Sequence, residues 1–310
     1  MGYPDSFHEV AKKVNNWGRW GDDDQIGTIN LVTDDVVREA SSLVRTGRRI
    51  SLALPLSDLE GIQTGLIRGR ANPLRTMVSI NTAVFGDPSQ FCTSDDVVFM
   101  GLQAATHWDG IGHATYDGRM YNGYPISSID EWGASQCGIH HIRSLTSRGV
   151  LLDVARAKGL DELAAGYPIH GDDLDAAAEL GKVTVRSGDI VLVRTGSGRH
   201  LRAPDHDVTA YNSGSGLTVD TATWFRERDV AAVATDNLTF EVFPCEDPAA
   251  FLPVHPLHLV EMGMTQGQNW MLEELADDCA ADGVYEFFLE ASPQPFTNAL
   301  GSPVNPVAIK

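Results

Sequence analysis

The stretch QAATHWDGIGHATYDGRMYNGY occupies residues 103–124 and decides how the rest of the chain is interpreted. It places Gln103, His107, Asp109 and His113 at odd-numbered positions. Side chains alternate between faces on an extended backbone, so these four are expected to point to one side. On a helix, His107 and Asp109 would lie about 200° apart and could not converge. The two glycines between Asp109 and His113 also disfavour a helix and allow a ligand to approach the backbone closely.

Imidazole and carboxylate groups on one face suit a divalent metal such as Zn²⁺ or Mn²⁺. A bound metal lowers the pKa of its water towards neutrality and so creates a nucleophile that attacks a carbonyl. We expect His113, slightly further along the chain, to act as the acid/base that moves the proton. The alternative that the spacing leaves open is a set of hydrogen-bonded polar residues in a loop.

The same stretch resembles the H-x-G-T-H-x-D-x-P-x-H signature of the metal-dependent cyclase family, which includes bacterial kynurenine formamidase and isatin hydrolase. Thr106, His107, Asp109 and His113 match the signature. Gln103 stands where the first His is expected, and two further positions carry Ala and Ile in place of Gly and Pro. The resemblance implies an α/β chain of the swivelling β/β/α type with a mixed sheet as its core.

The resemblance also extends to the C-terminal third, where a His and then a Glu complete the metal site of the formamidases. His255 and Gln268 fall near those places, and His258 and Glu273 are the alternatives under a shifted alignment. Gln268 would replace a bridging carboxylate by a neutral amide, and two divalent cations that share one carboxylate repel each other. The resemblance with these departures therefore implies a single ion, Mn²⁺ or Zn²⁺, as in isatin hydrolase. Its expected ligands are His107, Asp109, Gln103, Gln268 and His255.

Four further residues are candidates for contact with a small-molecule substrate: Trp108, Tyr121, Asn122 and Asp236. Tyr121 and Asn122 lie in a turn after the key stretch, and the alternative for them is an ordered surface turn. Asp236 lies at the polar end of a predicted buried strand, and functional groups often gather at strand ends in α/β sheets. Its alternative role is to hold a turn by hydrogen bonds.

The remaining sequence alternates strand and helix patterns, which indicates an α/β architecture with crossover connections. Residues 1–49 are expected to form an N-terminal extension whose Trp17 and Trp20 pack on the body, and residues 50–310 a single catalytic domain. Predicted strands cover residues 50–56, 77–85, 95–102, 149–155, 188–196, 230–237 and 285–291. Predicted helices cover residues 36–45, 172–181 and 220–228, and long loops cover 58–76 and 196–218.

Composition limits the possible partners. The chain has 310 residues, 43% of them hydrophobic, and a formal net charge of −19 with no basic run to offset it. This charge argues against nucleic acid and anionic membranes as partners. The four cysteines are spread out without a CxxC pair, which is typical of reduced thiols in a cytoplasmic protein. The family resemblance implies a homodimer or a larger homo-oligomer.

The function favoured by these observations is a metal-dependent hydrolase that acts on carbon–nitrogen bonds other than peptide bonds, in a cyclic or aryl amide, or on a lactone. The first alternative is a ring-closing cyclase or dehydratase that uses the same site. The second is a ligand-binding homologue without catalysis, suggested by Gln103 and Gln268 in place of stronger ligands. No HExxH, GxSxG, Walker A or GxGxxG motif occurs in the sequence.

Overall fold

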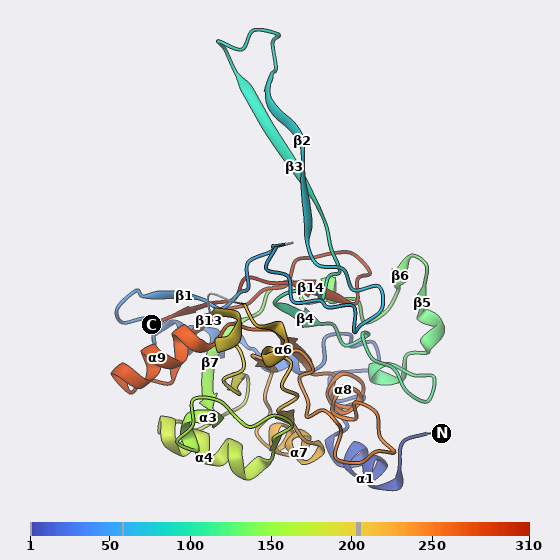
Figure 1. The fold of residues 1–310 in the computed structure, drawn as a ribbon. Coiled ribbons are helices and arrows are strands. Elements are labelled where there is room, and N and C mark those ends of the chain that lie inside the picture. Colours follow the sequence, from blue (N-terminus) through green and yellow to red (C-terminus); the bar gives the residue numbers. More distant parts are fainter. Residues whose placement is uncertain (1, 58, 203–205) are drawn as a thin grey trace.

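A curled mixed sheet forms the centre of the protein (Figure 1). The computed structural model describes residues 2–57, 59–202 and 206–310, and within them the sheet has nine strands in the order β1-β15-β13-β7-β9-β11-β12-β4-β14. The four central strands run parallel: β7 (Thr146–Asp153), β9 (Ile190–Arg194), β11 (Ala232–Thr235) and β12 (Thr265–Gln268). Antiparallel strands flank them: β13 (Glu286–Glu290), β15 (Val307–Ile309) and β1 (Arg49–Ser51) on one side, β4 (His107–Asp109) and β14 (Gly301–Pro303) on the other.

The central strands are buried on both faces, which explains their nearly continuous apolar sequences. Along β9, Val191 and Val193 belong to one apolar cluster, whereas Ile190 and Leu192 belong to the other. The same alternation of faces holds along β7 and β11. Each face is therefore covered by a layer of its own.

Helices supply these two layers. The first cluster contains side chains of α1 (Asp5–Val14), α4 (Gly171–Gly181) and α7 (Val219–Glu227), which lie together below the sheet in Figure 1. The second contains side chains of α9 (Glu273–Asp282), while α2 (Asp34–Ser41) contacts β7 and β13.

Short elements complete the described chain. They are α3 (Val154–Ala157), α5 (Arg199–Arg202), α6 (Val208–Tyr211), α8 (Val254–Pro256), the π-helix η5 (Leu257–Met262), the 3₁₀ turns η1 (Gly27–Leu31), η2 (Tyr121–Gly123), η3 (Ile126–Ser128) and η4 (Ile139–His141), and the strands β5 (Ile129–Asp130), β6 (Gly133–Ala134), β8 (Pro168–Ile169) and β10 (Gly216–Leu217). Within the described ranges, no helix has both the length and the apolar character needed to cross a membrane.

The N-terminal segment lies against the body. Helix α1 contacts α7 and η5, and Trp17 donates a hydrogen bond from Nε1 to the carbonyl of Val260 at 2.7 Å. These contacts agree with the expected packing of Trp17, while the division into an extension and a catalytic domain stays a prediction.

The predicted α/β architecture is confirmed, with differences at the ends of elements. The helix expected over 36–45 begins at Asp34 and ends at Ser41, and Thr33 caps it by accepting a hydrogen bond from the Val36 amide. The strand expected over 50–56 covers only Arg49–Ser51, because that is the part that pairs with β15.

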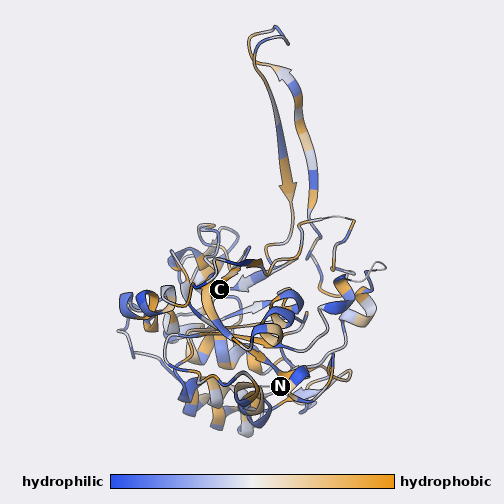
Figure 2. Cartoon of the chain, turned by 90° about the vertical axis from the view of Figure 1, so that its left-hand side faces the viewer, coloured by the Kyte–Doolittle hydropathy of each residue, from blue (hydrophilic) through white to orange (hydrophobic). Residues whose placement is uncertain are grey.

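The strands expected over 77–85 and 95–102 are present as β2 (Leu74–Ala83) and β3 (Cys92–Phe99), but they do not join the central sheet. Within the described part of the chain they pair only with each other, and they form a long hairpin that projects from the body (Figures 1 and 2). We call residues 74–99 the arm.

Candidate functional site

The backbone of residues 103–124 is extended at the two expected ligands, because His107–Asp109 form β4 between β12 and β14. His107 lies opposite Gln268, and Asp109 lies opposite Gln266 on β12 and Gly301 on β14. Directly paired residues of antiparallel strands share a face. The expected common face of His107 and Asp109 is therefore present, and Gln268 shares it.

The other face of these strands belongs to the core. Trp108 packs there against Trp270, with ring centroids 4.8 Å apart, and donates its indole N–H to the carbonyl of Ala291. Gly267 lies between the two indoles: a Cβ at this position would be 2.6 Å from Nε1 of Trp270 and 2.9 Å from Cζ3 of Trp108. Glycine at 267 thus lets the two rings support the strands beneath the site.

His107 is held in one tautomer. Its Nδ1 lies 2.8 Å from the carbonyl oxygen of Ala105, which can only accept a hydrogen, so Nδ1 carries the proton. Nε2 is therefore a free lone pair. It is buried without a hydrogen-bond partner among the described residues, as is Oδ1 of Asp109, and the two atoms are 3.4 Å apart.

His113 and Gln103 lie on the open side of this pair. Nε2 of His113 is 3.6 Å from the same Oδ1 of Asp109, and the side chain keeps 26% of its surface exposed. Gln103 approaches Nδ1 of His113 from its amide at 3.5 Å. Its amide also fills the space over Gly301, where a Cβ would lie 2.5 Å from Nε2 of Gln103.

His255 reaches the site from α8. Its Nδ1 is hydrogen-bonded to the carboxylate of Glu241, so its Nε2 faces Gln268 at 3.1 Å. The Gln268 amide also donates to Oδ2 of Asp109 at 3.2 Å. A carboxylate behind an imidazole is the usual outer partner of a metal-binding histidine, since it fixes the ring and makes the free nitrogen a better ligand.

These groups fit a divalent ion although they do not form a closed cage. Among the residues that the structure describes, no group of three or more His, Cys, Asp or Glu side chains is arranged so that it could hold a metal ion, so any ion here would also need the glutamine amides. Two ligands of a tetrahedral ion, each about 2.0–2.2 Å from it, lie about 3.3–3.6 Å from one another. The separation from Oδ1 of Asp109 to Nε2 of His107, 3.4 Å, matches this spacing, and Nε2 of His113 lies on the open side, 3.6 Å from the same oxygen. Rotation of the Gln268 amide would present its oxygen to the same point, because amide orientation follows the hydrogen bonds available.

The charges of the site groups are strongly coupled. Burial by itself raises the pKa of the Asp109 carboxyl, but the imidazoles of His113, His107 and His255 outweigh it and hold that pKa well below its usual value. Desolvation lowers the pKa of His113, and Asp109 offsets only part of the effect. Burial also acts to lower the pKa of His255, but Glu241 more than compensates and raises it. A carboxylate that stays ionised beside a neutral His113 is the state that binds cations and accepts protons.

The side chains of three predicted substrate residues make contacts away from the His107–Asp109 pair, and contact of any of the four with substrate stays a prediction. Trp108 points into the core, as described above. Tyr121 is buried and donates its hydroxyl to Asp24. The Asn122 side chain accepts a hydrogen bond from the amide of Gly18 and donates to the carbonyls of residues 21, 22 and 24. Tyr121 and Asn122 therefore fasten the N-terminal segment to the turn that follows the site.

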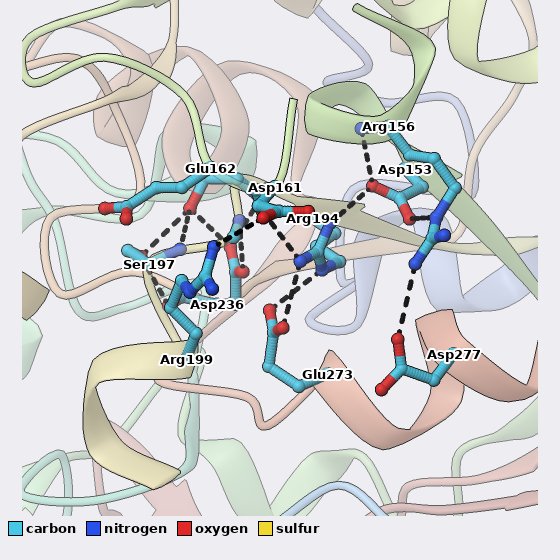
Figure 3. Close-up of polar contacts among 12 residues, drawn as sticks. Asp153, Arg156, Asp161, Glu162, Arg194, Ser197, Arg199, Asp236, Glu273 and Asp277 are labelled. Atoms are coloured by element: carbon cyan, nitrogen blue, oxygen red, sulfur yellow. Dashed lines mark hydrogen bonds and ion pairs between the residues drawn. The ribbon is translucent and has the colours of Figure 1, made fainter. Parts of the chain in front are cut away.

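Asp236 belongs to a neighbouring buried network at the carboxyl ends of β7, β9 and β11 (Figure 3). It accepts hydrogen bonds from the amide and hydroxyl of Thr195, both at 2.8 Å, and from the amide of Gly196 at 2.9 Å. Burial, reinforced by Glu273 and opposed by Arg194, raises the pKa of Asp236 to about 6. These contacts correspond to the alternative role of Asp236, which is to hold a turn.

Glu273, the alternative to Gln268 as a metal ligand, is bound by Arg194 in the same network. Arg194 binds both carboxylate oxygens of Glu273, at 2.8 and 2.9 Å, and Oδ1 of Asp153 at 2.8 Å. His258, the alternative to His255, is fully buried, and neither of its ring nitrogens has a partner among the described residues. The contact with Gln268 therefore favours His255 at this position.

Two residues near the site were not expected from the sequence. Glu241 is one, because the sequence around it contains no motif that indicates a role at the site. Arg70, four residues before the arm, is the other: it is partly buried, and its charge acts on Asp109, His113 and His255. No salt bridge to Arg70 occurs within the described part of the chain. Its position in an irregular loop gives the sequence no periodicity from which to place it.

Comparisons with known proteins define the class. The family described as "Putative cyclase" matches residues 43–242. A solved structure described as a novel cyclase is 37% identical, with 96% of this chain and 100% of that chain covered and a TM-score of 0.85. The chain therefore belongs to this cyclase family, and its fold is the family's fold.

More distant solved structures share the fold. Isatin hydrolase A from Labrenzia aggregata is 17% identical, with 87% of this chain and 94% of that chain covered and a TM-score of 0.60. The corresponding enzyme from Ralstonia solanacearum is 16% identical, with coverages of 84% and 91% and a TM-score of 0.61. A structure described as a potential metal-dependent hydrolase with cyclase activity is 14% identical, with coverages of 84% and 96% and a TM-score of 0.52. The comparison with curated proteins found no match.

Proposed function

We propose that this protein is a metal-dependent hydrolase of small cyclic or aryl amides, or of lactones. The observation that carries the proposal is a buried pair of atoms, Nε2 of His107 and Oδ1 of Asp109, that have no hydrogen-bond partner within the described ranges, with Nε2 of His113 3.6 Å from that oxygen. Burying two polar atoms without partners is costly, so their retention two positions apart on the same strand, β4, is best explained by a cation between them. The similarity to isatin hydrolases and to a potential metal-dependent hydrolase supports the same class.

His107 and Asp109 would hold the ion, with Gln268 and His255 on one side and Gln103 on the other. Zn²⁺ and Mn²⁺ both accept such a mixture of nitrogen and oxygen ligands. A bound divalent ion would lower the pKa of a water molecule and polarise the substrate carbonyl. With Asp109 as the sole ionised carboxylate among these ligands, we propose one ion per chain.

His113 is the proposed acid/base. Its imidazole is neutral at ordinary pH because desolvation lowers its pKa, so it can take a proton from water at Nε2. It then returns the proton to the leaving nitrogen or oxygen, which otherwise departs as an unstable anion. Its partly exposed side chain suits a group that meets the substrate, whereas His107 is completely buried.

Arg70 is proposed to bind the negative charge that develops on the substrate carbonyl and remains on the carboxylate product. Cations aimed at developing charge act strongly in a site shielded from water. An Arg70→Ala variant is expected to lose turnover, and Arg70→Lys to regain part of it, because lysine keeps the charge but not the forked geometry. Equal turnover in all three proteins would remove Arg70 from the mechanism.

The test combines metal content with product analysis. Purified protein, stripped and reloaded with Mn²⁺ or Zn²⁺, is assayed against cyclic amides, lactones and acylated aryl amines in ¹⁸O-labelled water. We expect metal-dependent turnover with one labelled oxygen in the product. Asp109→Asn should lose both the ion and the turnover, whereas Asp172→Asn, on the exposed first turn of α4, should keep both.

A ring-closing reaction at the same site is the second candidate, favoured by the description of the family as a cyclase. It would give turnover without incorporation of labelled oxygen. A protein that binds no metal would instead support the non-catalytic alternative and refute the hydrolase.

A further inference from the structure

A cavity of about 330 Å³ lies between α1, the start of α7 and the segment 241–254 that leads into α8. Helices α1 and α7 contact each other there, on the side of the body away from the arm (Figure 1). Small-molecule sites have volumes of about 300–1,000 Å³, so the cavity is large enough for a small ligand. Among the described residues that line it, none is an expected metal ligand, so the cavity is separate from the candidate metal site.

The walls of the cavity are mainly apolar and are held in place by the packing behind them. They include Phe7, Val10, Leu217, Val219, Val242 and Val254. The ring of Phe7 stacks on Tyr3, with centroids 4.2 Å apart, and meets the edge of Tyr116 at 5.3 Å. Because such walls are ordered before a ligand arrives, binding costs little conformational entropy.

The charged residues that line the cavity are all acidic. They are Asp220, Glu241, Glu246 and Asp247, and no Lys or Arg lines the cavity among the residues that the structure describes. Asp220 and Glu246 share one imidazole, that of His170, at 2.9 and 3.7 Å. Asp247 accepts a hydrogen bond from the Ala249 amide and forms no ion pair within the described ranges. Negative charge therefore remains in excess at the cavity even when His170 is protonated.

An apolar interior beside uncompensated carboxylates fits a hydrophobic amine. The ammonium group would lie at the carboxylates, and the aromatic or aliphatic body would fill the interior. An anionic ligand would be repelled by the same carboxylates, and the net charge of −19 adds to this discrimination. A neutral apolar ligand would fill the interior but would leave the acidic groups without a partner.

Glu241 connects the cavity with the candidate metal site. Its Oε1 is hydrogen-bonded to the amide and to Nδ1 of His255, and its Oε2 accepts the Val254 amide at 2.9 Å. A carboxylate oxygen has two acceptor positions, so Oε2 can accept one more donor. Both Glu241 and Val254 line the cavity. A ligand there would therefore contact the groups that aim His255 at Gln268.

We propose that this cavity binds a hydrophobic amine in its protonated form, and that the bound amine weakens metal binding at the candidate site through Glu241. The ammonium group and the metal ion are both cations that depend on Glu241, the first directly and the second through His255. Each therefore lowers the affinity for the other, and by the same factor. The first half of the proposal stands on the cavity alone, whereas the second half rests on the proposed metal-dependent function.

Calorimetry with metal-free protein tests the site. The probes are phenethylamine and tryptamine, with phenethyl alcohol as the neutral match and hydrocinnamate as the anionic match. We expect both amines to bind once per chain, the alcohol to bind about tenfold more weakly than phenethylamine, and hydrocinnamate not to bind. Amines that do not bind, or that bind no better than the alcohol, would overturn the proposal.

Two variants locate the binding. Val10→Trp places an indole in the cavity from α1 and should abolish binding of every probe. Glu246→Gln combined with Asp247→Asn should weaken amine binding about tenfold and leave the alcohol unaffected.

The matched control is Glu227→Gln combined with Asp172→Asn, which removes the same charge at exposed positions that do not line the cavity. It should leave the affinity for amines unchanged. Circular dichroism establishes that the variants are folded. Equal amine affinities in the two double variants, or binding retained by folded Val10→Trp protein, would overturn the assignment to this cavity.

Chelator competition tests the link to His255. Saturating phenethylamine should weaken Mn²⁺ binding about fivefold or more in the native protein and should have no effect in Val10→Trp. An unchanged Mn²⁺ affinity in the native protein would overturn the second half of the proposal and leave the first. A protein that binds no divalent metal would refute the proposed function and the second half together, while calorimetry would still decide whether the cavity binds amines.

Discussion

The stability of the protein should fall in mild acid because of His258, a histidine buried in the core. Its ring is fully buried between Phe225 and Phe240, at centroid distances of 5.6 and 5.4 Å, and both nitrogens lack a partner among the described residues. Burial, with a smaller effect from His255, lowers the pKa of His258 to about 3, and Gln266 offsets only part of the shift. The imidazole is therefore neutral in the folded protein at any pH near neutrality.

The sign and size of the effect follow from the two pKa values. In the unfolded chain the imidazole titrates near the ordinary value of about 6.5, so below that pH the unfolded state binds a proton that the folded state excludes. The stability contributed by neutral His258 is complete above this pH and is lost as pH falls towards the folded pKa. At pH 5 the loss is about 2 kcal/mol relative to pH 7.5, because each pKa unit corresponds to about 1.36 kcal/mol.

Urea unfolding from pH 7.5 to pH 5, with a chelator present throughout, measures this loss directly. The His258→Leu variant should lose about 2 kcal/mol less than the native protein over this range. Leu259→Ala, a buried neighbour on η5, is the control: it should lower stability by about 2–5 kcal/mol at every pH and leave the pH dependence unchanged. Identical pH dependences in the native and His258→Leu proteins would show that the imidazole finds a proton acceptor, and the reasoning would be refuted.

Three further predictions concern the polar groups around the site. Glu241→Gln removes the carboxylate behind His255 and should weaken metal binding about 10–100-fold in a chelator competition, with circular dichroism unchanged; unaltered affinity would exclude His255 from the site. Gln268→Glu adds a second carboxylate, so elemental analysis should find two ions per chain instead of one, and an unchanged ratio would contradict the explanation of the single ion. Arg194→Met leaves Asp153 and Glu273 buried without their partner and should cost on the order of 3–5 kcal/mol in urea unfolding (Figure 3). The matched change at Arg199, which is 45% exposed, should cost at most about 1 kcal/mol, and equal costs would show that the buried pairs contribute little.

The strand at the site could be predicted from the sequence because the alternation of side chains involves only neighbouring residues. Alternation over His107, Trp108 and Asp109 depends only on the backbone being extended, and β4 is extended. The parallel strands were predictable for a similar reason, since strands buried on both faces need runs of apolar residues.

Other features depended on contacts between distant segments, which no local pattern records. The pairing of Glu241 with His255 requires a loop to fold back onto α8, and Arg70 approaches the site from an irregular loop. Asp236 was singled out because it lies near the end of a predicted buried strand, and it directly follows β11, but position alone does not distinguish a substrate ligand from a group that holds a turn. Trp108 lies between His107 and Asp109 on β4. Because successive side chains alternate between faces, its ring points into the core while theirs point to the site.

The arm shows a different limit. Its alternating sequence predicts strands, and strands are present, but alternation does not tell whether the partner of a strand is the central sheet or another hairpin strand. An alternating pattern predicts that apolar side chains lie on one face of a strand, but it does not indicate which other element packs against them.

The position of β4 between β12 and β14 has a consequence for how the protein is made. Its two neighbours lie far along the chain, with Gln268 placed 159 residues after Asp109 and Gly301 further still. A polypeptide emerging from the ribosome therefore carries the imidazoles and the carboxylate long before it has the strands that aim them. The proposed metal site is therefore complete only after the last strands have been synthesised, and the late closure of such long loops favours slow folding.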